Sequence, residues 1–194
     1  MASPPSQPNG VLRDQALRFM LERRGAAIVP VTGGETSMVP HLYGGDAVLV
    51  VPLGRPPAPG DLLLYRQQDY WVVHRCLGAA TGPDGAPGFR TRGDGRNVLD
   101  PHLLSDNILA RVVALRRAGQ WSSLQGSSAR GYARCMAWHG LCWAAAGVLA
   151  RKARLGNAVA AMDLATLRTV VPLVFPLIHR RIPPPTANWA DGAL

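Results

Sequence analysis

The sequence predicts a mainly β domain with a short helix before it and a helical appendage after it. Residues 26–117 hold short runs of apolar and β-branched residues separated by glycine and proline, which is the pattern of successive strands and turns. Residues 11–24 and 135–150 instead carry apolar residues over lengths typical of helices. We therefore divide the chain into a lead-in with a short helix (1–25), a β core (26–117), and a linker with a helical segment (118–194).

Length and composition fit one folded domain with an appendage. The chain has 194 residues, of which 47% are hydrophobic, and a net charge of +9, so it can build a core. This charge permits contact with an anionic membrane or with nucleic acid. The arginines are scattered, however, and no aromatic residues alternate with them to stack on bases, which argues against nucleic-acid binding.

The N-terminal helix and the strands follow from hydrophobic spacing. Apolar residues recur at helical intervals among the arginines of Val11–Arg24, as in an amphipathic helix. This segment lacks the apolar stretch of a secretory signal or a membrane anchor. We expect strands at Ala26–Val31, Ala47–Val51, Asp61–Arg66, Tyr70–Leu77, Phe89–Thr91 and Ile108–Arg116.

Two segments between these elements are predicted to be irregular. Gly78–Gly88 is rich in glycine, proline and alanine, and Gln120–Arg130 is polar. We therefore expect a loop at the first and a linker at the second.

The last part of the chain is predicted to be helical and leaves two locations open. Cys135–Ala150 contains no acidic or basic residue and is followed by Arg151, Lys152 and Arg154; it is shorter than the ~20 residues that span a bilayer. We expect further helix at Leu155–Leu167 and an apolar segment, broken by prolines, at Val170–Ile178. A hairpin in the interface of an anionic membrane and an ordinary helical subdomain of a cytoplasmic protein fit about equally well.

The stretch from Thr36 to Val50 presents one serine next to a strand. Pro40 cannot continue a helix and disfavours α conformation at the preceding residue, so Ser37–His41 is expected to be an extended turn. Gly44 and Gly45 then permit a tight reversal before the strand. The Ser37 hydroxyl is therefore expected at the edge of a strand, on the surface.

Four segments stand out in order along the chain. They are the segment that begins Ser37-Met38-Val39-Pro40; Gly60-Asp61-Leu62-Leu63-Leu64-Tyr65; Val72-Val73-His74-Arg75; and Gly93-Asp94-Gly95-Arg96-Asn97-Val98-Leu99-Asp100. They resemble, in that order, the nucleophile box, the second strand box, the general-base box and the acidic box of the signal peptidase clan of serine proteases, which includes the LexA-type self-cleaving repressors. The resemblance covers roughly residues 26–117.

The resemblance implies a histidine as the general base. Much of the clan uses a lysine, but the only lysine here is Lys152, beyond every box. Archaeal and endoplasmic-reticulum signal peptidases have a histidine in a Val-Val-His-Arg context like that of His74. Histidine suits the role because an imidazole with a pKa of about 6.5 is largely neutral and still basic at physiological pH.

Two aspartates are candidates for the acid that orients His74. Asp94 and Asp100 both align with acids of the family pattern, and a carboxylate fixes the tautomer of a catalytic imidazole. We favour Asp100, because Gly93-Asp94-Gly95 is also typical of a turn in which the aspartate binds backbone amides. Asp94 is then expected to support the site.

The resemblance leaves the oxyanion hole open. Many relatives have a serine two residues before the nucleophile, where this chain has Glu35. An ionised carboxylate there would repel the developing oxyanion. Glu35 must therefore point away or be protonated, or backbone donors must suffice.

A metal site is not expected. Cys135, His139 and Cys142 share a helix face, but three ligands over two turns of one rigid helix do not converge on one ion. Cys76 stands alone in a strand, and the cysteine spacing gives no disulfide pattern.

The sequence thus predicts a signal peptidase-like serine endopeptidase that needs no cofactor. Ser37 would attack, His74 would transfer the proton, and Met38 and Pro40 would form the wall of the substrate site. The resemblance implies a precursor, signal or leader peptide cut after a small residue. The alternatives are a LexA-type self-cleaving regulator, for which the N-terminal segment offers only one short helix, and a non-catalytic binding module on the same fold.

Overall fold

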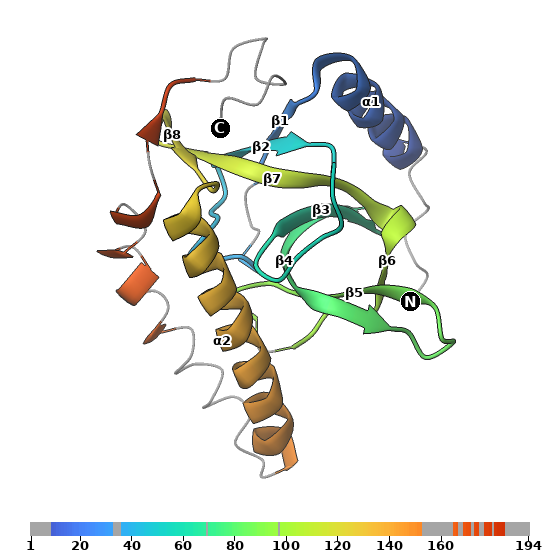
Figure 1. Ribbon diagram of the computed structural model, residues 1–194, viewed down its shortest axis with the longest axis vertical. Coiled ribbons are helices and arrows are strands. Elements are labelled where there is room, and N and C mark those ends of the chain that lie inside the picture. The colour runs from blue at the N-terminus through green and yellow to red at the C-terminus, as the bar shows by residue number, and fades with distance from the viewer. Residues whose placement is uncertain are drawn as a thin grey trace.

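The computed structural model confirms a mainly β fold with a helix near the N-terminus and a second long helix that begins at Ser127. It describes residues 9–32, 36–68, 70–96 and 98–152, and the short pieces 165–166, 169–171, 173–174, 177–179 and 181–184. The elements are α1 (Asn9–Arg24), β1 (Ala27–Pro30), β2 (Ala47–Val51), β3 (Leu62–Gln67), β4 (Tyr70–Thr81), β5 (Pro87–Arg92), β6 (Leu103–Leu104), the 3₁₀ turn η1 (Ser105–Asn107), β7 (Ile108–Arg117), β8 (Gln120–Ser123), α2 (Ser127–Lys152) and β9 (Arg181–Ile182) (Figure 1).

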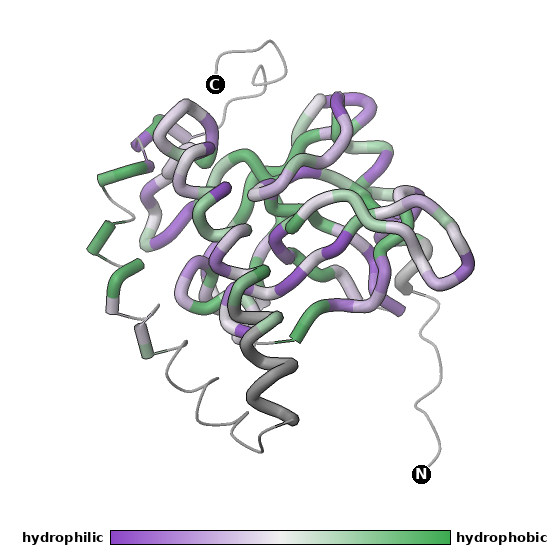
Figure 2. Tube along the Cα trace, turned by 60° about the horizontal axis from the view of Figure 1, so that its bottom comes forward, coloured by the Kyte–Doolittle hydropathy of each residue, from purple (hydrophilic) through white to green (hydrophobic). Residues whose placement is uncertain are grey.

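All strands pair antiparallel in one sheet. The described part of the chain has the strand order β1-β2-β7-β3-β4-β5-β6, with β8 added to β7 and β9 to β8. The strand β7 pairs with β2 along one edge, through residues 111–116, and with β3 (residues 108–112) and β8 (residues 114–117) along the other. Its 10 residues are enough for two partners in succession on one edge. Figure 2 shows hydrophobic segments running through the interior and hydrophilic residues in the outer loops.

The helix α1 packs on the sheet beside β1 and β7. Leu17 and Leu21 are buried in the same hydrophobic cluster as Val29 and Val48. The Asp14 carboxylate also accepts a hydrogen bond from Trp71 Nε1 at 2.5 Å, which ties α1 to β4. The amphipathic spacing of this segment is therefore explained by packing on the core.

The prediction of a loop at Gly78–Gly88 was wrong, because most of this segment is a long hairpin. The strand β4 continues to Thr81 and β5 starts at Pro87, so only residues 82–86 connect them. Gly78 has a φ of +139° and lies where the register of the β4–β5 pair shifts. A glycine at a β-bulge continues the strand pair, whereas composition alone suggests a break.

The prediction of a polar linker at Gln120–Arg130 was also wrong. β8 pairs with β7 through a tight turn at Ala118 and Gly119, which have positive φ values of 48° and 80°, as a two-residue hairpin turn requires. Trp121 anchors β8, since it is buried against β2 and β7. The helix α2 then starts at Ser127, eight residues before the predicted helix at Cys135.

The helix α2 lies against β4, and no helix in the described ranges is long and apolar enough to cross a membrane. The predicted second helix at Leu155–Leu167 lies outside the described residues except at positions 165 and 166, which are helical. Within Val170–Ile178, the described pieces are helical, and Leu173 and Leu177 are 69% and 84% exposed.

Candidate active site

Ser37 lies in a compact turn rather than in the predicted extended one. The Val39 amide donates to the Thr36 carbonyl at 3.1 Å, and the His41 and Leu42 amides both donate to the Met38 carbonyl. These bonds fold residues 37–41 into successive turns. Ser37 is only 7% exposed, so its hydroxyl is largely buried and does not stand on the surface as predicted.

The structure brings Ser37, His74 and Asp100 together in one chain of contacts. His74 Nε2 lies 2.9 Å from Ser37 Oγ, and His74 Nδ1 lies 2.7 Å from Asp100 Oδ2. His74 comes from β4 and is 3% exposed. A rigid strand therefore holds the imidazole between the hydroxyl and the carboxylate.

The charges fix which atoms carry protons. Burial opposes the charge of Asp100, but hydrogen bonds, chiefly to His74, outweigh it and lower the pKa of this carboxyl. An ionised carboxylate only accepts hydrogen bonds, so His74 Nδ1 carries the proton and Nε2 accepts from the Ser37 hydroxyl. This is the arrangement in which a histidine removes the proton of a serine nucleophile.

Tyr65 is a member of this site that the sequence reasoning missed. Its hydroxyl donates to Asp100 Oδ2 at 3.1 Å and lies 3.2 Å from His74 Nδ1. Burial and the nearby carboxylate raise the pKa of Tyr65 above its ordinary value, so it remains a donor. A signal existed: Tyr65 pairs with Val72 and Leu63 pairs with His74, so alternation puts Tyr65 on the same face as His74.

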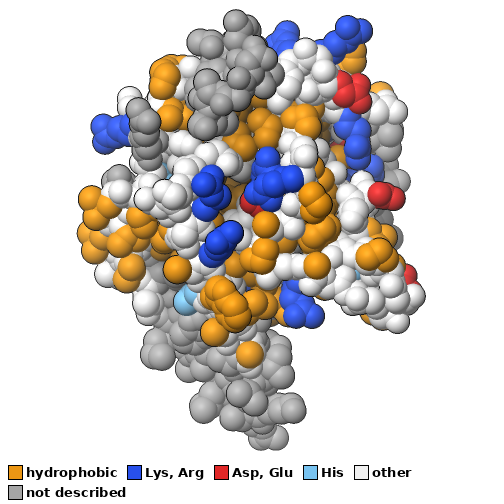
Figure 3. All heavy atoms as spheres, in the orientation of Figure 1, with side chains coloured by type: hydrophobic (Ala, Val, Ile, Leu, Met, Phe, Trp, Pro, Cys, Tyr) orange, Lys and Arg blue, Asp and Glu red, His pale blue; other side chains and the backbone are white. Residues whose placement is uncertain are grey.

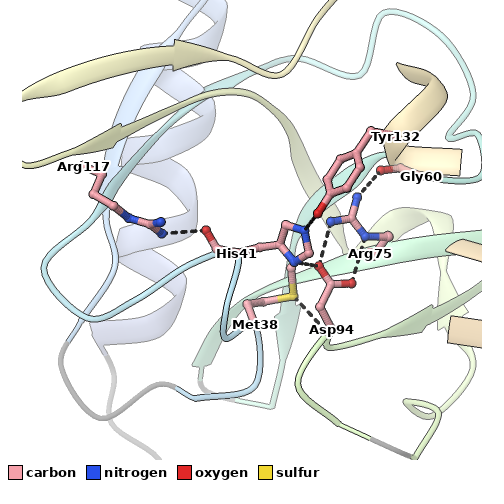
Figure 4. Close-up of polar contacts among 7 residues, drawn as sticks. All are labelled: Met38, His41, Gly60, Arg75, Asp94, Arg117 and Tyr132. Atoms are coloured by element: carbon pink, nitrogen blue, oxygen red, sulfur yellow. Dashed lines mark hydrogen bonds and ion pairs between the residues drawn. The ribbon is translucent and has the colours of Figure 1, made fainter. Parts of the chain in front are cut away.

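Asp94 does not touch His74 but lies at the centre of a second buried cluster (Figure 4). Arg75 binds both of its oxygens, at 2.8 and 2.7 Å, and also donates to the Gly60 carbonyl at 3.0 Å. His41 Nδ1 lies 2.9 Å from Asp94 Oδ2. Burial disfavours the charge of Asp94, but Arg75 and His41 outweigh burial and hold the pKa of this carboxyl well below its usual range.

The turn at 93–95 presses against the turn that carries the serine. The Gly95 amide donates to the Ser37 carbonyl at 2.8 Å, and the Asp94 amide lies 3.4 Å from Met38 Sδ. A Cβ on Gly93 would meet the Ser37 carbonyl oxygen at 2.4 Å and His74 Nε2 at 2.9 Å. Only glycine allows this close approach.

An apolar cleft opens beside Ser37. It has a volume of about 220 Å³. Its walls come from α1, the turn after Ser37, and strands β1 to β4. The apolar wall residues include Val29, Val31, Met38, Leu42, Val48, Leu64, Trp71 and Val73, and Arg13, Asp14 and Arg66 add charge. Met38 thus lines the cleft, whereas Pro40 does not line it and is fully buried.

The sequence also singled out Glu35 and the three cysteines. Glu35 lies outside the described residues. Cys135 and Cys142 are exposed free thiols, and the described residues hold no group of metal-binding side chains. Cys76 is buried, and burial raises the pKa of its thiol to about 11, so it is not a reactive thiolate.

Comparison with known proteins adds no relative. A scan against protein-family models finds no matching family. A search of curated proteins finds no match either. The interpretation of the site therefore rests on its residues and their geometry.

Proposed function

We propose that this protein is a serine endopeptidase of the signal peptidase type. The observation that carries the proposal is the unbroken contact from Ser37 Oγ through His74 to Asp100, at 2.9 and 2.7 Å. Ser37 and His74 are buried, the Asp100 side chain is 7% exposed, and Ser37 lines the cleft. A hydroxyl, an imidazole and a carboxylate in this order constitute a catalytic unit for acyl transfer.

In the proposed reaction, Ser37 Oγ attacks the carbonyl carbon of a peptide bond while His74 Nε2 takes the hydroxyl proton. Asp100 stabilises the imidazolium that forms. His74 then gives this proton to the amide nitrogen, the C–N bond breaks, and the amine product leaves an ester on Ser37. Water, deprotonated by His74, cleaves the ester to a carboxylic acid and restores the hydroxyl.

The cleft supports an extended peptide as substrate. Val29, Pro30 and Val31 line it, and β1 pairs only with β2 in the described part of the chain, which leaves one strand edge for a peptide backbone. The resemblance to signal peptidases favours a precursor, signal or leader peptide cut after a small residue. Because the wall residues are mostly apolar, they suit an uncharged peptide segment on the acyl side of the scissile bond.

The decisive experiment compares Ser37→Ala with Ser105→Ala, which changes an exposed serine in η1. We expect Ser37→Ala to abolish both cleavage of precursor peptides and labelling by a fluorophosphonate, while Ser105→Ala retains both. His74→Ala should be comparably inactive, and the double variant no worse than either single one, because members of a triad act as a unit.

The outcomes also separate the alternatives. Labelling that survives in Ser37→Ala would remove the proposal. One self-cleavage event without turnover of added peptide would indicate a LexA-type regulator. A wild-type protein that neither cleaves nor reacts would be a non-catalytic binding module.

We also propose that the enzyme associates with an anionic membrane surface. Trp138 on α2 and Leu173 are each 69% exposed, and Arg151, Lys152 and Arg154 follow the charge-free segment. Exposed apolar residues and a basic cluster in the same part of the sequence suit a lipid interface, where each basic residue adds roughly 1 kcal/mol.

Sedimentation with vesicles tests this location. The wild type should bind vesicles containing phosphatidylserine, more weakly as salt rises, and Leu173→Ser with Leu177→Ser should bind less. Binding to neutral vesicles isolates the apolar contribution. If the protein ignores anionic vesicles at low salt, it acts on a soluble precursor instead.

A further inference from the structure

The protein contains a second chain of a hydroxyl, an imidazole and a carboxylate, which joins α2 to the turn that carries Ser37. The Tyr132 hydroxyl lies 2.6 Å from His41 Nε2, and His41 Nδ1 lies 2.9 Å from Asp94 Oδ2 (Figure 4). Tyr132 belongs to α2, His41 to the turn after Ser37, and Asp94 to the turn that contacts it. Three separate segments therefore meet at one buried histidine.

The proton positions in this chain follow from its charges. Asp94 is ionised, so the His41 nitrogen that faces its carboxylate must carry the proton, because two lone pairs at 2.9 Å would repel. Burial lowers the pKa of His41, and Arg75 and Arg117 lower it further against the effect of Asp94. The imidazole is therefore neutral, and its Nε2 accepts a hydrogen bond from the Tyr132 hydroxyl.

This second chain is not a second catalytic centre. Arg75 binds both oxygens of Asp94, which reduces the ability of that carboxylate to stabilise an imidazolium. Burial also raises the pKa of Tyr132, so its hydroxyl is a poorer nucleophile than an ordinary phenol. The chain is built to hold positions rather than to transfer protons.

The geometry shows what it holds. Two contacts hold the serine turn at His41: Arg117 Nη2 donates to the His41 carbonyl at 2.8 Å, and the Tyr132 hydroxyl binds the His41 ring. The helix α2 is itself fixed against the core: a Cβ on Gly60 would lie 2.7 Å from the Ala133 carbonyl carbon. Tyr132 is therefore a rigid support for the turn.

Packing alone does not secure this support. His41 and Tyr132 line a cavity of about 340 Å³ between α2 and the sheet, which also includes Arg55, Arg130 and Arg134. Figure 3 shows basic side chains gathered near the centre of the face seen in the view of Figure 1. Tyr132 also packs against Met136 and Val171 and edge-on to the His179 ring. Because space borders the two rings as well, this packing is incomplete, and the hydrogen bond helps to set their relative position.

We propose that Tyr132 is a positioning residue that acts through His41 and Asp94 on the turn carrying Ser37, so that α2 helps to hold the catalytic serine in place. This inference rests on the proposed peptidase function. It assigns the C-terminal helix a role in the chemistry, in addition to any contact with a membrane. The role is indirect, since Tyr132 touches neither Ser37 nor the cleft.

The test compares Tyr132→Phe with Tyr43→Phe. Both remove one phenol oxygen, but Tyr43 is partly exposed, and Tyr43→Phe keeps the ring on which the Arg117 guanidinium lies. Losing a hydrogen bond that orients the serine turn should lower kcat by roughly 3–10-fold with KM nearly unchanged. Tyr43→Phe should keep wild-type kinetics. ¹⁵N spectra of the imidazoles should show a fixed Nδ1–H tautomer of His41 in the wild type and a tautomer mixture in Tyr132→Phe.

A second pair of variants, at His41, tests the same inference in case Tyr132→Phe is unstable. His41→Gln offers an amide that can donate toward Asp94 and accept from Tyr132. It should retain more activity than His41→Leu when each variant is assayed at the same number of degrees below its own melting temperature. Equal kcat in Tyr132→Phe and wild type, or no difference between the His41 variants, would overturn the inference. A wild type that does not react with fluorophosphonate would instead refute the peptidase proposal itself.

Discussion

Asp94→Asn is the most informative single substitution for the architecture of the site. It keeps the size of the side chain but removes the charge that Arg75 binds through both oxygens. The Arg75 and Asp94 side chains are each 4% exposed, so bulk water has little access to the pair. The variant leaves a buried guanidinium with a neutral partner.

The magnitude follows from burial. Removing one partner of a buried ion pair costs about 3–5 kcal/mol, and the amide oxygen that remains keeps the cost near the lower value. A chain of 194 residues loses about 2–4 °C in melting temperature per kcal/mol. We therefore expect Asp94→Asn to melt roughly 6–12 °C below the wild type at neutral pH.

The pH dependence gives an independent check with a defined sign. The pKa of Asp94 is lowered in the folded protein, so the folded state binds fewer protons at this group than the unfolded state does. Its stabilisation is complete above the unfolded pKa of about 4 and is lost as pH falls below that value toward the folded pKa. The difference between wild type and variant should therefore shrink below pH 4.

Differential scanning calorimetry from pH 3 to 8 measures both effects, with Asp106→Asn as the control at an exposed aspartate in η1. The control should melt within about 2 °C of the wild type, as surface substitutions usually do. A similar small change in Asp94→Asn, or a difference that does not depend on acid, would refute the view that Asp94 is the central charge of the second cluster.

Three further predictions concern activity and packing. Asp100→Asn should preserve the fold but leave His74 in the wrong tautomer, so that peptide hydrolysis falls by up to ~10⁴-fold; a milder loss of activity than in Asp94→Asn would transfer the orienting role. Tyr65→Phe removes a donor to Asp100 and should lower kcat by about 2–10-fold, measured in steady-state kinetics; unchanged kcat would make Tyr65 a packing residue. Gly60→Ala is compared with Gly45→Ala as the control, because Gly60 and Gly45 have similar φ values of +98° and +93°. Only at Gly60 would the new methyl group meet α2. Thermal melts should therefore show a further loss of about 1–3 kcal/mol for Gly60→Ala, and equal losses would mean that α2 yields without cost.

The sequence by itself determined the local structure wherever the spacing of apolar residues was sufficient. The strand at Ala47–Val51 has the predicted bounds, and α1, β3 and β7 lie within two residues of theirs. The alternation in β4 also placed Val72 and His74 on the face opposite Trp71 and Val73, as the two hydrophobic clusters confirm. These features depend on the backbone period of the element alone.

The sequence failed where a segment owes its form to a distant partner. β8 is polar apart from Trp121, and it is a strand because Trp121 inserts beside β7 and β2. The start of α2 was missed for a related reason, since its first turns are polar but include Ala129, which is buried, and Ala133, which lies against Gly60. Propensity is a weak guide where such tertiary contacts decide the conformation.

The composition of the site likewise divides into motif and geometry. The motifs pointed to Ser37 and His74, but they left two acids open, and only the fold places Asp100 against His74 and Asp94 against Arg75. The contacts of His74 with Ser37 and Asp100 join residues 37 and 26 positions apart, and Tyr132 meets His41 across 91 positions. Linear spacing carries no information on such pairs, because the register of the antiparallel strands and the docking of α2 set the distances between their side chains.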